Sequence, residues 1–403
     1  MKKEFKIIAY KMPPQENWNS FRDPAQKNPD HINEECYKKV AECGFTHGMG
    51  LLEHGAEVAE RALDTAERCG LKYYVRDAIN WANILHPDYY WYNGENYRKY
   101  QRYSSFAGVY IYDEPNANKY GDLAKMVKGY YDFFKGVGEP LVNLLPTYAN
   151  CVEQLGAESY EKYIDLYAEQ VPTDYILFDF YPFRVKDRVE EYLHDEFLYN
   201  CAVVARACKK SGKGYRAFIQ SSVMDRGKTD LLCSMLDFQI HTHLAHGAEG
   251  IVYYYYWGDE EGNGQNGLVD WHGNPTELYE GAKRINREIK SVAEKLLECK
   301  WQAVSYIKGE RAHFNEIEFA RQTEGEACDK FKAEYDLVVG EFDCCGKRAY
   351  YLVNYTNPRL GLENEVECLT NGDYDLFING ERKPLNGKTV KLSIGGGALL
   401  LPR

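Results

Sequence analysis

The stretch Gly108-Val-Tyr-Ile-Tyr-Asp-Glu-Pro115 decides how the rest of the chain is interpreted. Its β-branched and aromatic residues predict a buried strand, and the strand ends at Asp113 and Glu114 because the proline cannot continue it. Two acids held this close raise the pKa of one of them, which suits a general acid that must stay protonated near neutral pH. An acid pair that faces water and caps the next helix is the alternative interpretation.

Apolar runs of strand length alternate with helical patterns on both sides of this stretch. The predicted strands are 7–12, 46–52, 71–75, 108–112, 141–145, 175–180, 215–219 and 251–257. The predicted helices are 33–43, 56–69, 96–104, 120–135, 159–169, 189–210, 230–246 and 277–297. This repeated alternation predicts an α/β fold, the (β/α)8 TIM barrel. A doubly wound sheet is less well supported, because no strand is followed by a glycine-rich phosphate loop.

The pattern changes near residue 300. Short alternating strands at 337–341, 348–354, 374–378 and 389–394 are separated by Gly, Asn and Asp turns. They predict a small C-terminal β-sandwich. We therefore expect a catalytic TIM-barrel domain at 1–298 and a β-sandwich domain with a packing role at 299–403.

Composition excludes several classes of partner. The net charge of −12 argues against nucleic acid, and no apolar window is long enough for a membrane span. The 35 tyrosines and 6 tryptophans combine apolar faces with polar edges, which suits sugars. The 12 cysteines lack metal spacing and follow no secretory signal, so we expect free, buried thiols in a cytoplasmic protein without a cofactor. Nothing in the sequence indicates an oligomeric state.

TIM-barrel enzymes build their active sites at the C-terminal ends of the strands. The acids, amides and aromatic residues predicted at these ends are Glu53, His54, Asp77, Asp113, Glu114, Asn143, Tyr148, Asp179, Tyr181, Gln220, Tyr255, Tyr256 and Trp257. Trp271 lies in the loop after the last predicted strand. Together they predict an acidic and aromatic pocket with no metal ion.

An Asp-Glu pair at the end of the fourth barrel strand resembles the catalytic pair of retaining β-N-acetylhexosaminidases of glycoside hydrolase families 20 and 123. In family 123, which comprises β-N-acetylgalactosaminidases, the pair is also followed by proline. In these enzymes the 2-acetamido oxygen of the substrate attacks the anomeric carbon. The resemblance implies that Asp113 orients the acetamido group, and that Glu114 protonates the leaving oxygen and then activates water. Family 123 proteins carry a β-domain before the barrel, whereas this chain has its β-domain afterwards.

The remaining candidate residues are predicted to bind the sugar. Tyr181 is expected to hydrogen-bond the acetamido carbonyl, a role that the resembled families give to a tyrosine. Tyr255, Trp257 and Trp271 are expected to stack on sugar rings. Asp179 is expected either to hold sugar hydroxyls or to orient a neighbouring residue, and Asp77 and Gln220 are expected to line the same pocket.

Gln220 gives an internal reason for a substrate-assisted mechanism. Many retaining glycosidases with the acid on strand four place a nucleophilic Glu at the end of strand seven, and a glutamine cannot form the glycosyl ester. We therefore expect a glycoside hydrolase that releases terminal β-linked N-acetylhexosamine with retention, with the galacto sugar favoured over the gluco sugar, from an oligosaccharide or glycoconjugate.

Three alternatives stay open. A glycosidase acting on plain sugars would pair Glu114 with a second carboxylate, Asp179 or Asp77. A metal-dependent isomerase or hydrolase would use Glu53 and His54 with those acids, but no HxH or HExxH motif lies at a strand end. A non-catalytic glycan-binding barrel is the third.

Overall fold

The chain folds into two compact units. A computed structural model describes residues 4–18, 27–51, 53–76, 95–186, 189–222, 231–259, 267–311, 325–370 and 372–403. One unit comprises Lys6–Asp179 and Val252–Thr276, and the other Met1–Phe5, Phe180–Ile251 and Glu277–Arg403. The boundary expected after residue 298 stays a prediction.

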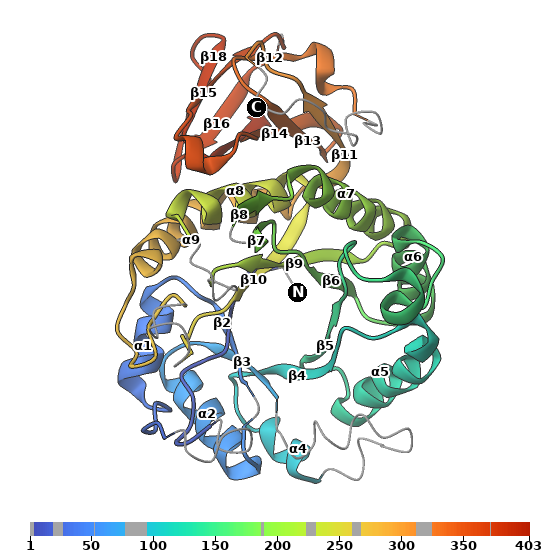
Figure 1. The fold of residues 1–403 in the computed structure, drawn as a ribbon, viewed down its shortest axis with the longest axis vertical. Coiled ribbons are helices and arrows are strands. Elements are labelled where there is room, and N and C mark those ends of the chain that lie inside the picture. The colour runs from blue at the N-terminus through green and yellow to red at the C-terminus, as the bar shows by residue number, and fades with distance from the viewer. Residues whose placement is uncertain are drawn as a thin grey trace. The chain divides into compact units, whose positions relative to one another are not determined.

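Eight strands of the described chain form a closed barrel in the order β1-β10-β9-β6-β5-β4-β3-β2 (Figure 1). The strands are β1 (Lys6–Tyr10), β2 (His47–Met49), β3 (Lys72–Val75), β4 (Phe106–Asp113), β5 (Glu139–Leu144), β6 (Tyr175–Asp179), β9 (Gly214–Gln220) and β10 (Ala248–Tyr254). Neighbouring strands from β1 to β6 pair in parallel. The predicted TIM barrel is thereby confirmed.

Helices follow most of the strands. They are α1 (Glu34–Glu42), α2 (Ala56–Arg68), α4 (Glu95–Tyr100), α5 (Tyr120–Phe134), α6 (Tyr160–Gln170), α7 (His194–Ser211), α8 (Cys233–Ala245) and α9 (Glu277–Leu296). In the first unit, α1, α2, α5 and α6 lie outside strands β1 to β6 (Figure 1). Among the described residues, none of these helices combines the length and the hydrophobicity that a membrane crossing requires.

The predicted helix at 189–210 is wrong at its beginning. A hairpin of β7 (Phe183–Lys186) and β8 (Val189–Tyr192) lies between β6 and α7. Val189 and Tyr192 flank two glutamates, a short pattern that fits a strand as well as a helix. Helix α7 begins only at His194.

Side-chain caps fix where several helices begin. The Asn33 side chain accepts a hydrogen bond from the Cys36 amide at 3.0 Å and begins α1. Ser159 accepts from the Lys162 amide at 3.2 Å and begins α6. Each cap satisfies an amide that would otherwise lack an intrahelical partner.

Gly108 lets β4 and β5 approach each other closely. Its φ of 142° is unfavourable for residues with a side chain, and a Cβ at this position would clash with the Glu139 carbonyl. The register also shifts between Tyr110 and Tyr112. The glycine therefore helps to set the pairing that brings Asp113 opposite Asn143 on β5.

The C-terminal region contains two antiparallel sheets, as the predicted β-sandwich requires. One has the order β11-β13-β14-β19-β16-β17 and the other β12-β15-β18. Their bounds are β11 (Lys300–Ile307), β12 (Phe331–Ala333), β13 (Leu337–Cys344), β14 (Lys347–Asn354), β15 (Asn364–Cys368), β16 (Tyr374–Ile378), β17 (Glu381–Pro384), β18 (Thr389–Leu392) and β19 (Gly397–Pro402). One buried apolar cluster includes Leu352 of the first sheet and Val366 of the second, so the two sheets share a core.

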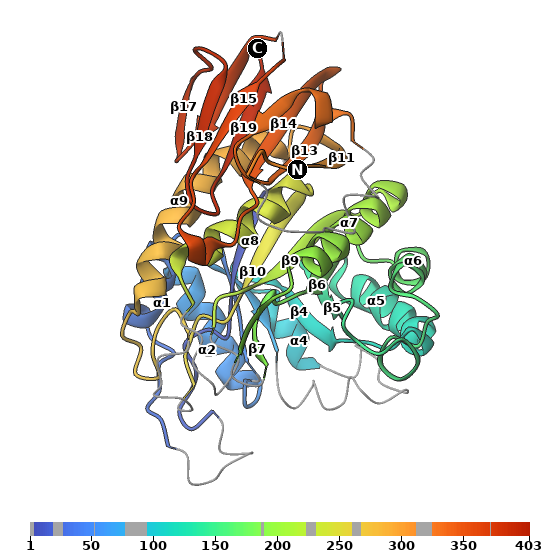
Figure 2. The ribbon, with the colours of Figure 1, turned by 45° about the horizontal axis from the view of Figure 1, so that its top comes forward.

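Within the second unit, α8 lies beside the larger C-terminal sheet, as Figure 2 shows. The Nδ1 atom of His241 lies 2.8 Å from the Tyr351 hydroxyl of β14. Burial lowers the pKa of His241 and of His243 to about 3, so both rings are neutral at neutral pH. These α8 histidines serve as packing groups.

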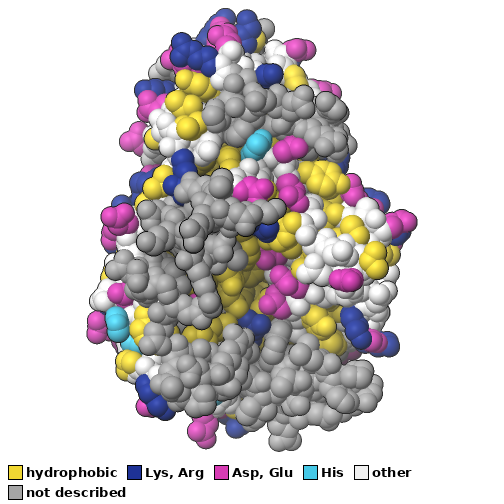
Figure 3. Space-filling model, viewed as in Figure 1, with side chains coloured by type: hydrophobic (Ala, Val, Ile, Leu, Met, Phe, Trp, Pro, Cys, Tyr) yellow, Lys and Arg dark blue, Asp and Glu magenta, His cyan; other side chains and the backbone are white. Residues whose placement is uncertain are grey.

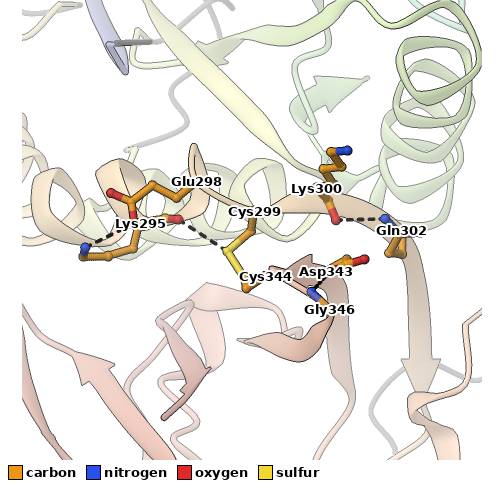
Figure 4. Close-up of a disulfide and its surroundings, with 8 residues drawn as sticks. All are labelled: Lys295, Glu298, Cys299, Lys300, Gln302, Asp343, Cys344 and Gly346. Atoms are coloured by element: carbon orange, nitrogen blue, oxygen red, sulfur yellow. Dashed lines mark hydrogen bonds and ion pairs between the residues drawn. A yellow bond between two sulfur atoms is a disulfide. The ribbon is translucent and has the colours of Figure 1, made fainter.

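A disulfide joins Cys299, between α9 and β11, to Cys344, the last residue of β13 (Figure 4). The expectation that all cysteines are free is therefore wrong for this pair. The expectation that the thiols are buried is also wrong for Cys328 and Cys345, which are exposed, although Cys43 is buried. The cytoplasmic location was inferred from reduced thiols, so it loses that support and stays a prediction.

Candidate active site

Asp113 and Glu114 occupy the C-terminal end of β4, as predicted. Asp113 is the last residue of the strand, and 41% of its side chain is exposed. Glu114 has a φ of 51°, a left-handed conformation that is uncommon for a residue with a side chain. Its amide donates to the Asn143 carbonyl at 2.9 Å, which ties the acid pair to β5. The chain thus turns sharply directly after Asp113.

Three donors surround the Asp113 carboxylate. The Tyr110 hydroxyl donates to Oδ1 at 2.5 Å, and the Asn143 Nδ2 atom donates to the same oxygen at 3.3 Å. An Arg76 guanidinium nitrogen lies 3.7 Å from Oδ2. A carboxylate can only accept from these groups, so together they fix its orientation.

Arg76 is itself held by residues at the ends of neighbouring strands. Its guanidinium donates to the Tyr10 hydroxyl at 2.5 Å, and it lies 4.7 Å from the centre of the Tyr110 ring. Its backbone amide donates to Glu53 at 2.9 Å, and the other Glu53 oxygen accepts from the Tyr73 hydroxyl at 2.6 Å. Both carboxylate oxygens of Glu53 therefore serve to support the end of β3.

Sequence reasoning missed Arg76, Tyr10 and Tyr110 as parts of this site. The sequence feature that could have identified Arg76 is its charge at the predicted end of a strand, directly before the candidate Asp77. Asp77 itself lies outside the described residues. No group of three or more His, Cys, Asp or Glu that could hold a metal ion occurs in the part of the chain that the structure describes.

The environment of Glu114 differs from that of Asp113. Desolvation, followed by the negative charge of Asp113, raises the pKa of Glu114. A raised pKa keeps a larger fraction of the carboxyl protonated near neutral pH, which a general acid requires. The two adjacent acids are therefore suited to different tasks, one as an oriented carboxylate and the other as a proton donor.

Asp179 ends β6 and is only 6% exposed. Burial, followed by the charges of Glu114 and Asp113, raises the pKa of Asp179 well above its usual range, although a hydrogen bond with Asn143 acts in the opposite direction. Asp179 therefore keeps its proton to a higher pH than an ordinary aspartate does. A neutral carboxylic acid is unsuited to act as a nucleophile or a base.

Several aromatic residues lie at the ends of β1 and β10. The Tyr254 ring stacks on the Tyr10 ring, with centroids 5.5 Å apart. The next residue, Tyr255, is buried, and its ring lies 4.6 Å from the Lys11 ammonium, which also contacts the Trp18 ring at 4.8 Å. Lys11 forms an ion pair with Asp259 as well. Tyr255 thus belongs to a packed cluster around a buried lysine.

Trp257 and Trp271 are also buried. Trp257 is 2% exposed and packs against the His31 ring, with centroids 4.5 Å apart. Trp271 lies 6.5 Å from the Trp18 ring. Both indole side chains are buried, so stacking on a sugar stays a prediction for these two residues and for Tyr255. Acidic and hydrophobic side chains are nevertheless exposed side by side near the middle of the face in Figure 3.

Gln220 ends β9, the seventh barrel strand along the chain, as predicted. It is 2% exposed, and its side-chain amide is used by the backbone of Phe183. Its Nε2 donates to the Phe183 carbonyl at 2.8 Å, and its Oε1 accepts from the Phe183 amide at 3.1 Å. This arrangement supports the β7–β8 hairpin and leaves Gln220 poorly suited to hold a sugar, so its predicted binding role is not supported.

Tyr181 follows β6 and is also buried.

Comparisons with known proteins extend this description. No protein-family model matches the chain, and no curated protein matches its sequence. A catalytic mutant of a GH42 β-galactosidase from G. stearothermophilus is similar over 100% of this chain and 98% of its own, with a TM-score of 0.61 and 8% identity. A β-galactosidase from the psychrophilic Marinomonas ef1 is similar over 73% of this chain and 62% of its own, with a TM-score of 0.50 and 11% identity.

At such low identity these similarities concern the fold. The chain has the TIM-barrel architecture that these glycoside hydrolases share, with a pair of carboxylates at the end of its fourth strand. The two β-galactosidases give no specific support to membership of family 123.

Proposed function

We propose that the chain is a retaining glycoside hydrolase that releases terminal β-linked N-acetylhexosamine from an oligosaccharide or glycoconjugate. The observation that carries this proposal is the contrast within the acid pair. Asp113 is oriented by three donors, whereas Glu114 has a raised pKa. The preference for N-acetylgalactosamine over N-acetylglucosamine rests on the resemblance to family 123 alone.

Each acid has one role in the proposed reaction. The Asp113 carboxylate accepts a hydrogen bond from the acetamido N–H, which makes the acetamido oxygen more nucleophilic. That oxygen attacks C1 while the C1–O glycosidic bond breaks, and Glu114 transfers its proton to the departing oxygen. Glu114, now a carboxylate, then takes a proton from the water that attacks C1 and opens the cyclic intermediate. Two attacks on opposite faces leave the β configuration unchanged.

The described strand ends support this route over a two-carboxylate mechanism. Gln220 stands where a nucleophilic glutamate would be expected, and its amide is used by Phe183. Asp179 is buried and has a raised pKa, which disfavours the charged form that a nucleophile needs. Of the carboxylates in the described part of the chain, Asp113 and Glu114 have the environments that the substrate-assisted route requires.

A pair of inhibitors tests the mechanism directly. A thiazoline analogue of the cyclic intermediate is expected to inhibit competitively, at concentrations at least about 100-fold below the substrate KM, because it resembles the transition state. A 2-deoxy-2-fluoro glycoside is expected to leave no covalent sugar on the protein by mass spectrometry. A stable glycosyl adduct on any carboxylate would contradict the proposal and would identify the nucleophile.

A glycan-binding protein without turnover is the competing class. Glu114→Gln separates a binding protein from an enzyme. A binding protein would hydrolyse no sugar before or after the substitution and would keep its sugar affinity. An enzyme would keep much of its affinity and lose its rate.

A further inference from the structure

Two buried oxygen atoms beside the acid pair accept no hydrogen bond from the described residues, although the side chains that carry them interact with each other. They are Oδ1 of Asn143 on β5 and Oδ1 of Asp179 at the end of β6. Both side chains are well buried, at 4% and 6% exposure. Leu177 and Phe178 of β6 pair with Asn143 and Leu144 of β5, so these two polar side chains belong to adjacent strand ends.

The orientation of the Asn143 amide follows from its neighbour. Its Nδ2 donates to Asp113 Oδ1 at 3.3 Å, and a carboxylate cannot donate in return. The carbonyl end of the amide is therefore the end left without a partner. Asn143 also accepts the Glu114 amide on its backbone carbonyl at 2.9 Å. A single residue thus touches both proposed catalytic acids and presents an unused acceptor beside them.

Unpaired buried oxygens are costly. Leaving a buried acceptor unsatisfied is unfavourable, so two of them at adjacent strand ends call for donors that the described side chains do not supply. At the catalytic face of a TIM barrel, a natural reason is that a ligand supplies the missing donors. A metal ion is a poor candidate, since the described residues near this point include no group of three carboxylates, imidazoles or thiols that could hold one.

We infer that Asn143 and Asp179 form a specificity subsite for ring hydroxyls of the sugar that Glu114 and Asp113 would process. The subsite rests on the proposed function, because it assumes that a sugar lies against the acid pair. Hydroxyls fit both partners. The Asn143 carbonyl oxygen accepts from a hydroxyl, and a neutral Asp179 both donates to and accepts from one.

Neutral hydroxyls are favoured over charged ligand groups by the same surroundings. Burial is the main cause of the raised pKa of Asp179, and the charges of Glu114 and Asp113 add to it, so a further anionic group such as a sulfate, phosphate or carboxylate is disfavoured beside it. An ammonium group would be attracted, but it would also favour the ionised forms of these acids and remove the proton that Glu114 needs.

The test combines two side-chain truncations with substrates that lack one hydroxyl. Asn143→Ala and Asp179→Ala are expected to lower kcat/KM on the complete aryl glycoside by about 10- to 100-fold, the value of one or two hydrogen bonds. On a deoxy substrate that lacks the contacted hydroxyl, Asp179→Ala and the unaltered protein are expected to agree within about threefold. An equal penalty for Asp179→Ala on every deoxy substrate would overturn the subsite.

Asp179→Asn gives a second, sharper readout. An amide replaces a neutral acid of almost the same shape, so we expect Asp179→Asn to recover most of the kcat/KM that Asp179→Ala loses. A loss of more than about 100-fold would show that Asp179 works as a charged carboxylate, which contradicts the inference. Asp375→Asn makes the same chemical change in the C-terminal sheet, where Asp375 pairs with Arg382 and Arg403, and is expected to leave the substrate preference unchanged.

Failure of the proposed function would be recognised separately. If no N-acetylhexosaminide is hydrolysed, binding of free N-acetylhexosamines, galactose and glucose to the whole protein is measured by ligand-observed NMR. If Asp179→Ala abolishes sugar binding and Asp375→Asn retains it, the subsite is supported although the proposed reaction is contradicted. Binding that neither variant changes, or no binding of any sugar, would overturn the subsite as well.

Discussion

The ends of β4 and β9 hold polar residues at equivalent places in the barrel, yet their surroundings differ. At the end of β4, side-chain donors from Tyr110, Asn143 and Arg76 approach Asp113, and part of the carboxylate remains exposed. At the end of β9, both ends of the Gln220 amide bind the backbone of Phe183. A polar residue at a strand end is therefore a candidate for chemistry only when its bonding capacity is left open to a ligand.

Replacing the proposed acid is expected to have the largest effect. Glu114→Gln removes the proton that the leaving oxygen needs, so kcat on an aryl β-N-acetylhexosaminide should fall by about 10²–10⁴-fold. The melting temperature should change little, because glutamine has nearly the same shape as glutamate and part of this side chain reaches solvent. Initial rates and a thermal melt measure the two quantities. If the variant retains more than a tenth of the activity, Glu114 is not the general acid.

Asp113→Asn is expected to have the next largest effect. The neutral amide cannot polarise the acetamido group or stabilise the positive charge of the intermediate, so kcat should fall by about 10²–10³-fold. The loss should appear in kcat more than in KM, because the interaction strengthens in the transition state. A change confined to KM would make Asp113 a binding residue only.

Gln220→Glu tests whether the end of β9 can take part in catalysis. The new carboxylate would face the Phe183 carbonyl, to which it cannot donate, so the free energy of unfolding should fall by about 1–3 kcal/mol. Urea denaturation measures this loss. No activity toward plain β-glycosides should appear, because the side chain is directed into a backbone contact. Gain of such activity would show that the end of β9 is accessible to substrate.

The pH dependence of kcat/KM is expected to change least. Glu114 must be protonated for the first step, so activity should fall as the pH rises through its pKa, which lies above the usual glutamate value. Desolvation and the charge of Asp113 both contribute to that rise. Asp113→Asn removes the second cause, so the alkaline limb of the residual activity should move to lower pH. A limb that stays in place or moves to higher pH would mean that another group titrates.

Much of the fold could be predicted from the sequence because each β/α unit has its own local signal. Hydrophobic periodicity placed the barrel strands to within a few residues, and the predicted helix at 159–169 agrees with α6 to within one residue at each end. The β7–β8 hairpin was missed because a four-residue strand has too few positions to distinguish its period from a helical one. The Cys299–Cys344 disulfide was missed because it depends on the register of the C-terminal strands.

The candidate site was predicted less completely for a similar reason. Asp113 and Glu114 stood out because the strand, the acids and the proline are contiguous. Arg76 and Tyr10 contribute only because parallel pairing brings the ends of β1, β3 and β4 near one another, and no local pattern marks that arrangement. For Gln220 the sequence predicted the position correctly but not the bonding partner.

Hydrolysis of matched aryl β-glycosides tests the central claim most directly. The panel pairs N-acetylgalactosaminide with galactoside and N-acetylglucosaminide with glucoside, with the same nitrophenol leaving group. We expect turnover of the acetamido members alone, with a kcat/KM at least about 10³-fold above their plain partners, because only they carry the nucleophile. Comparable turnover of the plain glycosides would contradict the substrate-assisted mechanism and would require a carboxylate nucleophile from the protein.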